Sequence, residues 1–438
     1  MPFRALGLEP TIQQAVSEAG YTQPTPIQAA SIPLILEGRD LIGIAQTGTG
    51  KTAAFTLPML SMLSKRLASG GPRHTRALIL APTRELVVQI DENLRTYAKH
   101  LHLKIAKVYG GVGERPQADA LRNRADVVIA TPGRLIDLMG QGHADFTRLE
   151  FLILDEADRM LDMGFLPPMR KIVAALPQRR QTLLFSATLS KEIERLTHEF
   201  QHNPKIVEIG RRTNTADTVA QAIYEVPKHL KSNLLIHLLK DENLNMVLVF
   251  SRTKHGADRI TRQLARSGIE SAAIHGNRSQ PQRQRALTDF KTGKIRVLVA
   301  TDIAARGIDV DGITHVVNYD FPPATEDYIH RIGRTGRAQA EGDAISFITE
   351  DDRDALRALE RFTGKKIERK VAQGFDLTAP APPKQENDSP RGGGRPGGQN
   401  RQGGRPAPQK QQPKSQPKPD SPRGSGEGTG APRRRRRR

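Results

Sequence analysis

The chain has 438 residues and carries 67 Lys and Arg against 47 Asp and Glu, a formal net charge of +20. The chain is longer than a typical single domain and is predicted to form two or three domains. Its positive charge indicates a polyanionic partner such as nucleic acid, or an anionic membrane surface. The absence of cysteine excludes a disulfide framework and any cysteine-based metal or redox site.

The sequence has no feature of a membrane or secreted protein. No apolar run approaches the roughly 20 residues that a helix needs to cross a bilayer. The N-terminal stretch MPFRALGLEPTIQQAV lacks the basic region and the continuous apolar region of a signal peptide. We therefore expect a soluble, cytoplasmic protein without a membrane partner.

Short apolar runs recur along residues 1–370, and segments with helix-like spacing lie between them. The runs are DLIGIA at 40–45, ALILA at 77–81, DVVIA at 126–130, FLIL at 151–154, VLVF at 247–250 and RVLVA at 296–300. Such runs are typical of parallel strands that are buried on both faces and joined by crossover helices. The alternation predicts an α/β fold.

The first motif with a chemical meaning is AQTGTGKT, residues 45–52, between the apolar DLIGIA and the helix-like AAFTLPML. Strand, glycine-containing loop and helix follow in the order of a phosphate-binding P-loop, although Ala45 replaces its first glycine. Lys51 would reach the β- and γ-phosphates and Thr52 would ligate Mg²⁺. The other phosphate-cradling candidates are Gln46, Thr47, Gly48, Thr49 and Gly50. The alternative is a glycine-rich turn that only caps a helix.

Three carboxylates follow a buried strand in FLILDEADRML, residues 151–161. Taken alone, the stretch is an acidic loop that solvates its own charges. A P-loop ATPase, however, needs an aspartate at the end of a strand to hold Mg²⁺, directly or through water. Asp155 is therefore the candidate metal residue, and Glu156 is the candidate that positions the attacking water.

The chain changes character twice. NPKIVEIGRRTNTADTVA, which spans 203–220, shows no strong helical stripe, so we place a linker at 210–219 between a first domain, 1–209, and a second domain, 220–370. Residues 371–438 contain 12 Pro, 12 Gly and 15 Lys and Arg against 5 Asp and Glu. Such a composition predicts a disordered basic tail.

With AQTGTGKT and DEAD in one chain, the sequence resembles the DEAD-box ATP-dependent RNA helicases. Further segments that resemble the family's motifs are GYTQPTPIQ at 20–28, APTREL at 81–86, GG at 110–111, TPGR at 131–134, SAT at 186–188, VLVFSRT at 247–253, VATDIAARGID at 299–309 and HRIGRTGR at 330–337. The resemblance covers roughly residues 1–365. RTKHGA and SAAIHGN are most similar to the bacterial RhlE group.

The resemblance implies two RecA-like domains, with ATP bound between them and RNA bound across both. Gln28 would pair with the adenine base, with Phe3 and Tyr21 nearby, and Asp309 would contact the ribose. Arg334 and Arg337 would be arginine fingers that stabilise charge on the γ-phosphate. Residues that would couple ATP binding to domain closure are Asp158, Ser186, Thr188 and His330.

The RNA contacts implied by the resemblance are contacts to the phosphate backbone. The candidates are Arg84, Gly111, Thr131, Arg134, Arg252, Thr301 and Gly307. Six Tyr and no Trp in the whole chain argue against an extensive base-stacking platform, so we expect little sequence specificity.

The function expected from these motifs is RNA-stimulated ATP hydrolysis that unwinds short RNA duplexes or remodels RNA–protein complexes. One alternative is a DNA-translocating helicase of related fold, and another is an RNA-binding clamp or chaperone with little turnover. Ribosomal or RNA-decay proteins are candidate partners. The basic tail is either an RNA anchor or an inert extension.

Overall fold

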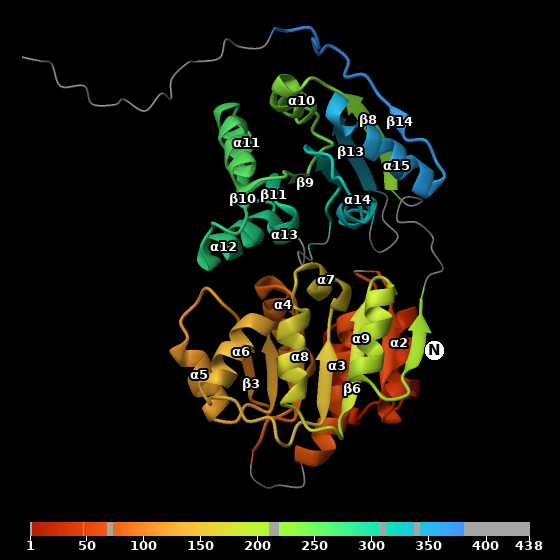
Figure 1. Cartoon of the computed structure of the whole chain (residues 1–438), viewed down its shortest axis with the longest axis vertical. Coiled ribbons are helices and arrows are strands. Elements are labelled where there is room, and N and C mark those ends of the chain that lie inside the picture. Colours follow the sequence, from red (N-terminus) through yellow and green to blue (C-terminus); the bar gives the residue numbers. More distant parts are fainter. Residues whose placement is uncertain are drawn as a thin grey trace, which may run out of the picture. The chain divides into compact units, whose positions relative to one another are not determined.

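The computed structural model describes residues 2–46, 48–67, 73–209, 219–305, 310, 312–336 and 342–380. Several predicted site residues lie outside these ranges, namely Thr47, Gly307, Asp309 and Arg337, as does the tail from residue 381. The described residues form two parallel β-sheets of seven strands each, with helices beside both (Figure 1). No helix among them is both long and apolar enough to cross a membrane.

The first sheet uses the first half of the chain. Its strands are β1 (Leu41–Ile44), β2 (Ala77–Leu80), β3 (Ile105–Val108), β4 (Val127–Ala130), β5 (Phe151–Leu154), β6 (Gln181–Ser186) and β7 (Lys205–Glu208). Its helices are η1 (Phe3–Leu6), α1 (Pro10–Glu18), α2 (Pro26–Leu36), α3 (Lys51–Leu67), α4 (Arg84–Tyr97), α5 (Arg115–Arg122), α6 (Pro132–Gly140), α7 (Ala157–Asp162), α8 (Leu166–Ala174) and α9 (Lys191–Phe200). The strand order is β3-β4-β2-β5-β6-β1-β7.

The second sheet follows after residue 218. Its strands are β8 (Val219–Glu225), β9 (Val247–Phe250), β10 (Ser271–Ile274), β11 (Val297–Ala300), β12 (His315–Asn318), β13 (Gly342–Ile348) and β14 (Glu368–Arg369). Its helices are η3 (Lys228–Leu230), α10 (Lys231–Leu238), α11 (Lys254–Arg266), α12 (Gln280–Lys291), α13 (Asp302–Ala305), α14 (Thr325–Ile332), η4 (Glu350–Asp352) and α15 (Arg353–Thr363). The order β10-β11-β9-β12-β13-β8-β14 repeats that of the first sheet, strand for strand.

Both sheets are buried on both faces, as the continuous apolar runs predict. In β5, Ile153 packs with residues of α3 and α4, whereas Leu152 and Leu154 pack with residues of α6 and α8. In β9, Val249 packs with α10 and α11, whereas Leu248 packs with α12 and α13. The predicted α/β fold with two tandem RecA-like domains is confirmed.

Two helices that begin at predicted RNA motifs start with the same capping interaction. The Thr83 hydroxyl accepts the Leu86 N–H at 3.3 Å at the start of α4, and the Thr253 hydroxyl accepts the Gly256 N–H at 3.0 Å at the start of α11. These bonds satisfy backbone donors that a helix N-terminus leaves without partners.

The second folded part continues past residue 370, where the change in composition places the start of the tail. Residues 370–380 lie along α10 and the second core, with Phe375 and Ala379 partly buried. The His237 ring lies 5.5 Å from the Phe375 ring between centroids, and a His229 ring nitrogen hydrogen-bonds the Ala379 carbonyl at 2.9 Å. A few apolar side chains, together with bound carbonyls, hold a segment whose composition predicts disorder.

Candidate active site

The loop between β1 and α3 has the backbone of a phosphate-binding turn. Gly48 and Gly50 have φ angles of 83° and 91°, a region that glycine enters at little cost. Lys51 begins α3, is 6% exposed, and donates its Nζ to the Ala45 carbonyl at 2.5 Å. Free backbone N–H groups at the start of α3 and the adjacent ammonium together favour a phosphate group.

Gln28 of α2 is bonded to the same loop. Its Nε2 donates to the Gly50 carbonyl at 3.1 Å, and its Oε1 accepts the Thr25 N–H at 3.0 Å. A Cβ on Gly50 would lie 2.4 Å from Gln28 Nε2, so this close approach requires glycine. The segment GYTQPTPIQ and the phosphate loop are therefore in direct contact through Gln28. To pair with adenine, Gln28 would have to break these two hydrogen bonds and form new ones with the base. Adenine pairing by Gln28 stays a prediction.

The two aromatic residues expected near the base differ in exposure. Tyr21 is 44% exposed, and its hydroxyl lies 3.3 Å from that of Tyr97. Phe3 is 6% exposed and belongs to the first core. Both line one pocket beside α1. Tyr21 thus offers an accessible ring, whereas Phe3 supports the pocket from within.

The acidic residues lie at the carboxyl end of β5. Asp155 is 2% exposed, and its Oδ1 accepts the Glu156 N–H at 3.0 Å. Burial, and then the neighbouring Glu156 carboxylate, raise the pKa of Asp155 to about 7. Burial and the Glu156 charge outweigh the Lys51 charge and the Glu156 N–H, which favour ionisation, so an added cation would stabilise the ionised form of Asp155.

Glu156 sits on a strained backbone and is held by an arginine. Its φ of 52° is unusual for a residue with a side chain, and such outliers occur at functional sites. Its carboxylate pairs with Arg159, one turn later in α7. Burial opposes ionisation of Glu156, but Arg159, Arg334 and Lys51 outweigh it and hold the pKa of Glu156 below its ordinary value.

Asp158 connects the DEAD turn to the SAT segment. Its Oδ2 accepts the Ala187 N–H at 3.0 Å, between Ser186 and Thr188. The Ser186 hydroxyl donates to the Thr188 carbonyl at 2.8 Å. These bonds fix the end of β6 against the start of α7.

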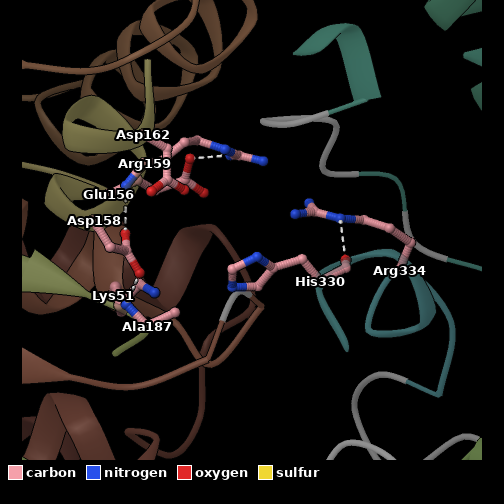
Figure 2. A pocket seen from close by; sticks show the side chains of 8 residues that line it. All are labelled: Lys51, Glu156, Asp158, Arg159, Asp162, Ala187, His330 and Arg334. Carbon is pink, nitrogen blue, oxygen red and sulfur yellow. Dashed lines mark hydrogen bonds and ion pairs between the residues drawn. The ribbon is translucent and has the colours of Figure 1, made fainter. Parts of the chain in front are cut away.

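One pocket gathers residues that are far apart in the sequence (Figure 2). It is lined by Lys51, Glu156, Asp158, Arg159, Asp162, Ala187, His330 and Arg334. His330 lies on α14 and Arg334 follows that helix, so both come from the second domain. Arg334 is 5% exposed, and its Nε donates to the His330 carbonyl at 3.3 Å. The pocket thus brings a predicted arginine finger to the predicted phosphate lysine and water-positioning glutamate.

The RNA candidates of the first domain follow three adjacent strands, β3, β4 and β2. Gly111 has a φ of 80°, and a Cβ there would lie 2.0 Å from Arg84 Nη1, so the loop after β3 closes directly over Arg84. Thr131 precedes α6 and makes no side-chain cap bond. Buried Nε and Nη1 atoms of Arg134 have no hydrogen-bond partner among the described residues. A guanidinium with unsatisfied donors suits an oxyanion.

The RNA candidates of the second domain follow the corresponding strands. Arg252 follows β9, its side chain is 61% exposed, and Thr301 follows the adjacent β11. Arg252 Nη2 donates to the Phe321 carbonyl at 3.1 Å.

Comparison with known proteins agrees with this geometry. The DEAD/DEAH box helicase family matches residues 25–196, and the helicase conserved C-terminal domain matches residues 230–339. DEAD-box ATP-dependent RNA helicase 30 of Arabidopsis thaliana is 44% identical over 408 residues, which cover 90% of this chain and 68% of the relative. The chain belongs to the DEAD-box helicase family.

A bacterial relative and a solved structure are also similar to this DEAD-box protein. ATP-dependent RNA helicase RhlB of Pseudomonas syringae pv. tomato is 44% identical over 370 residues, covering 83% of this chain and 93% of the relative. A structure of S. cerevisiae Dbp5 bound to RNA and ADP BeF3 has a TM-score of 0.76 and 30% identity, covering 85% of this chain and 96% of that one.

Sequence reasoning missed Arg159 of this DEAD-box protein. Arg159 is 8% exposed, lines the pocket and pairs with Glu156. The signal was present, since residues three apart on a helix lie side by side and oppositely charged residues at that spacing attract.

Proposed function

We propose that this DEAD-box helicase binds ATP and RNA together, distorts one RNA strand so that a short duplex separates locally, and releases the strand after ATP hydrolysis. Remodelling of RNA–protein complexes would use the same cycle. The observation that carries this proposal is the pocket in which Lys51 and Glu156 meet His330 and Arg334. Hydrolysis would then depend on residues of both RecA-like domains.

Each residue of the pocket has a role that follows from its chemistry. Lys51 holds the β- and γ-phosphates, and Glu156 orients the water that attacks the γ-phosphorus. Arg334 stabilises the charge that develops on the transferred phosphoryl oxygens. Arg337 lies outside the described residues, and its role as a second finger is part of this proposal. His330 senses the nucleotide state through its position beside Lys51 and Ala187 (Figure 2).

Thr52 and Asp155 would hold the Mg²⁺ that accompanies ATP. The residues fit this ion because a hydroxyl and a carboxylate are the oxygen ligands that Mg²⁺ prefers. The pKa of Asp155, raised to about 7 by burial, also shows a carboxylate that a cation would stabilise in its ionised form. Mg²⁺ supplies positive charge that offsets the charge of the β- and γ-phosphates.

RNA would bind along the carboxyl ends of β3, β4, β2, β11 and β9. The unsatisfied buried donors of Arg134 support a phosphate contact. The hydroxyls of Thr131 and Thr301 and the exposed guanidinium of Arg252 suit further phosphate oxygens. Because these groups address the backbone, the expected specificity for sequence is low.

The test is phosphate release from ATP with RNA and with DNA of equal length. We expect strong stimulation by RNA and little by DNA. Equal stimulation by DNA would favour the DNA-translocating helicase, and RNA binding without phosphate release would favour the clamp or chaperone.

Within the family, we place the chain in the bacterial RhlE group, because RTKHGA at 252–257 and SAAIHGN at 271–277 are similar to that group. We also propose a cytoplasmic location, because the sequence has no cysteine and no apolar run long enough to cross a membrane, with ribosomal or RNA-decay proteins as candidate partners. Sequencing of RNA crosslinked to the protein in cells would identify the RNA substrate.

A further inference from the structure

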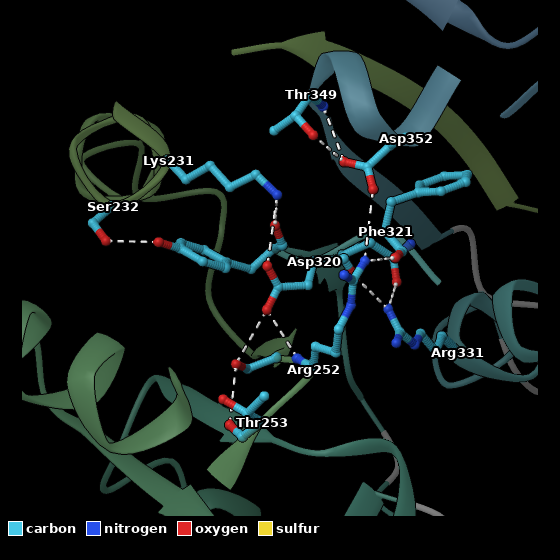
Figure 3. Close-up of polar contacts among 12 residues, drawn as sticks. Lys231, Ser232, Arg252, Thr253, Asp320, Phe321, Arg331, Thr349 and Asp352 are labelled. Carbon is cyan, nitrogen blue, oxygen red and sulfur yellow. Dashed lines mark hydrogen bonds and ion pairs between the residues drawn. The ribbon is translucent and has the colours of Figure 1, made fainter. Parts of the chain in front are cut away.

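A buried lysine of the second domain lies outside the pocket described above. Lys231 begins α10, is 5% exposed, and donates its Nζ to the Tyr319 carbonyl at 2.9 Å. The same ammonium lies 3.6 Å from Asp320 Oδ1. Figure 3 shows the Lys231 side chain reaching from α10 toward Asp320. Burial lowers the pKa of Lys231, and the charge of Asp320 opposes this shift.

Lys231 occupies the place in the second sheet that Lys51 occupies in the first. Each lysine is the first residue of the helix that follows the corresponding strand, β8 or β1. The preceding segment of the second domain, 226–230, contains no glycine and ends in the short helix η3 (Lys228–Leu230). Lys231 therefore lacks the turn of positive-φ glycines that precedes Lys51, and its surroundings do not form a phosphate cradle. The fold gives this lysine no second nucleotide site to serve.

The other oxygen of Asp320 fixes the turn after β9. Asp320 Oδ2 accepts the Arg252 N–H at 2.9 Å and lies 3.3 Å from the Ser251 hydroxyl. This turn leads directly into Thr253, the N-cap of α11. A carboxylate here satisfies a backbone donor that is no longer part of the strand ladder. Lys231 supplies the positive charge that lets this carboxylate remain beside the core.

The Arg252 side chain is directed by the same segment. Its Nη2 donates to the carbonyl of Phe321, the residue after Asp320, and lies 3.6 Å from Asp352 Oδ1. Asp352 accepts the Thr349 N–H at 3.0 Å and its hydroxyl at 2.7 Å, so it is itself fixed. Both the backbone and the guanidinium of Arg252 thus depend on the segment that Lys231 anchors (Figure 3).

We propose that the Lys231–Asp320 pair positions Arg252 for the RNA backbone, and so sets RNA affinity although neither member touches RNA or ATP. This inference rests on the proposed RNA contact of Arg252. The lysine of this pair is buried and the Asp320 side chain is 26% exposed. An ion pair with a buried member is a poor source of stability compared with apolar packing, and its best-attested use is to specify one arrangement. Here the specified arrangement is a turn with an exposed cation.

The experiment uses the full chain and measures the RNA concentration that gives half-maximal ATP hydrolysis. Lys231→Met should raise this concentration about tenfold, a coupling of the size found within one hydrogen-bond network. The maximal rate and the KM for ATP should not change. Lys231→Arg should recover part of the loss. Lys228→Met is the matched control, because Lys228 is exposed on η3 and lies outside the network.

A double-mutant cycle with Arg252→Ala separates positioning from general stability. Arg252→Ala should weaken RNA affinity, and adding Lys231→Met should weaken it little further. Additive effects, or a fall in maximal rate with Lys231→Met, would overturn the positioning role. If Arg252→Ala leaves RNA affinity unchanged, the RNA contact of Arg252 is wrong and the pair cannot act through it. Loss of RNA stimulation in the unaltered protein would instead refute the proposed function.

Asp320→Asn keeps the measurement decisive where Lys231→Met does not fold. The asparagine Oδ1 still accepts the Arg252 N–H, but the attraction to Lys231 is lost. We expect a smaller rise in the RNA requirement than with Lys231→Met, again absent in the Arg252→Ala background. A thermal unfolding curve for each variant confirms that folded protein is being compared.

Discussion

The two RecA-like domains share one strand order but differ in what stands at the carboxyl ends of their strands. The half of each sheet expected to face RNA is repeated. Thr83 and Thr253 cap the helices after β2 and β9, and Thr131 and Thr301 follow β4 and β11. Hydroxyls and helix N-termini are groups that bind a phosphate backbone, and both domains present them after corresponding strands.

The nucleotide half is not repeated. In the first domain, Lys51 and Asp155 stand near a glycine loop and next to Glu156. At the corresponding strands of the second domain, Lys231 and Asp320 form an ion pair, and Asp320 accepts the Arg252 N–H. The proposed hydrolysis mechanism uses the carboxylates of the first domain and an arginine of the second domain. A second set of catalytic carboxylates is not required. The lysine and aspartate of the second domain pair with each other and hold the turn at Arg252.

The largest effect should come from removing the cation that the second domain contributes. Arg334→Ala should lower the rate of ATP hydrolysis by about 10³–10⁵, the range for loss of an arginine finger. ATP affinity in the absence of RNA should change little, because the contact serves the transition state. Arg353→Ala, an exposed arginine of the same domain, is the control. Equal losses in affinity and rate would refute the finger assignment.

The acidic centre should show the next largest effect. Glu156→Gln keeps the shape of the side chain but loses the carboxylate that orients water, so single-turnover hydrolysis should slow by about 10²–10⁴. ATP and RNA binding should persist. Glu194→Gln, on the exposed side of α9, should leave the rate unchanged. Normal RNA-stimulated turnover of Glu156→Gln would show that the role assigned to Glu156 is wrong.

Substitution of Lys51 and of Lys231 compares the contributions of the two domains to ATP affinity. Lys51→Ala should raise the dissociation constant for ATP roughly ten- to a hundredfold, from the about 1.5–3 kcal/mol of a hydrogen bond to a charged group. Lys231→Ala should leave ATP affinity unchanged when RNA is absent, because its ammonium is bonded to Tyr319 and Asp320. A loss of ATP affinity in both variants would mean that the second lysine also reaches the nucleotide.

The proposed RNA-binding loops of the two domains should respond alike to the loss of one hydroxyl. Thr131→Val and Thr301→Val each remove one hydroxyl, and each should weaken RNA affinity by about fivefold, as expected for a neutral hydrogen bond of about 1 kcal/mol. The slope of affinity against salt should stay the same, because no charge is lost. Titration of RNA at several salt concentrations measures both quantities. An effect in only one domain would limit RNA contact to that domain.

The sequence predicted what local patterns encode. Apolar runs identified the buried strands, and AQTGTGKT and DEAD identified Lys51, Asp155 and Glu156, because glycine spacing and strand-end carboxylates are readable within a few residues. The pocket itself needed the resemblance, since nothing in HRIGRTGR alone indicates that Arg334 would reach Glu156.

Long-range polar networks could not be predicted from the sequence. Lys231 and Asp320 belong to no motif that the sequence analysis identified, and the fold alone brings them to Arg252. The extension at 370–380 was missed for a similar reason. Its few apolar residues do not predict order, yet α10 supplies a surface, and His229 of η3 and His237 of α10 hydrogen-bond its carbonyls.

The smallest effect on maximal rate is expected from the tail, and two truncations distinguish its parts. Deletion of 381–438 should leave the maximal ATP hydrolysis rate and the unfolding midpoint nearly unchanged, whereas deletion of 371–438 should lower the midpoint, because Phe375 then leaves His237 and the second core. If the basic tail anchors RNA, both truncations should require more RNA for half-maximal hydrolysis. Each lost phosphate contact on single-stranded RNA should also lower the slope of log affinity against log salt by about 0.7. Unchanged RNA affinity and slope would identify an inert extension, and because RNA binding and unfolding are measured separately, that outcome would leave the packing of 371–380 as a distinct result.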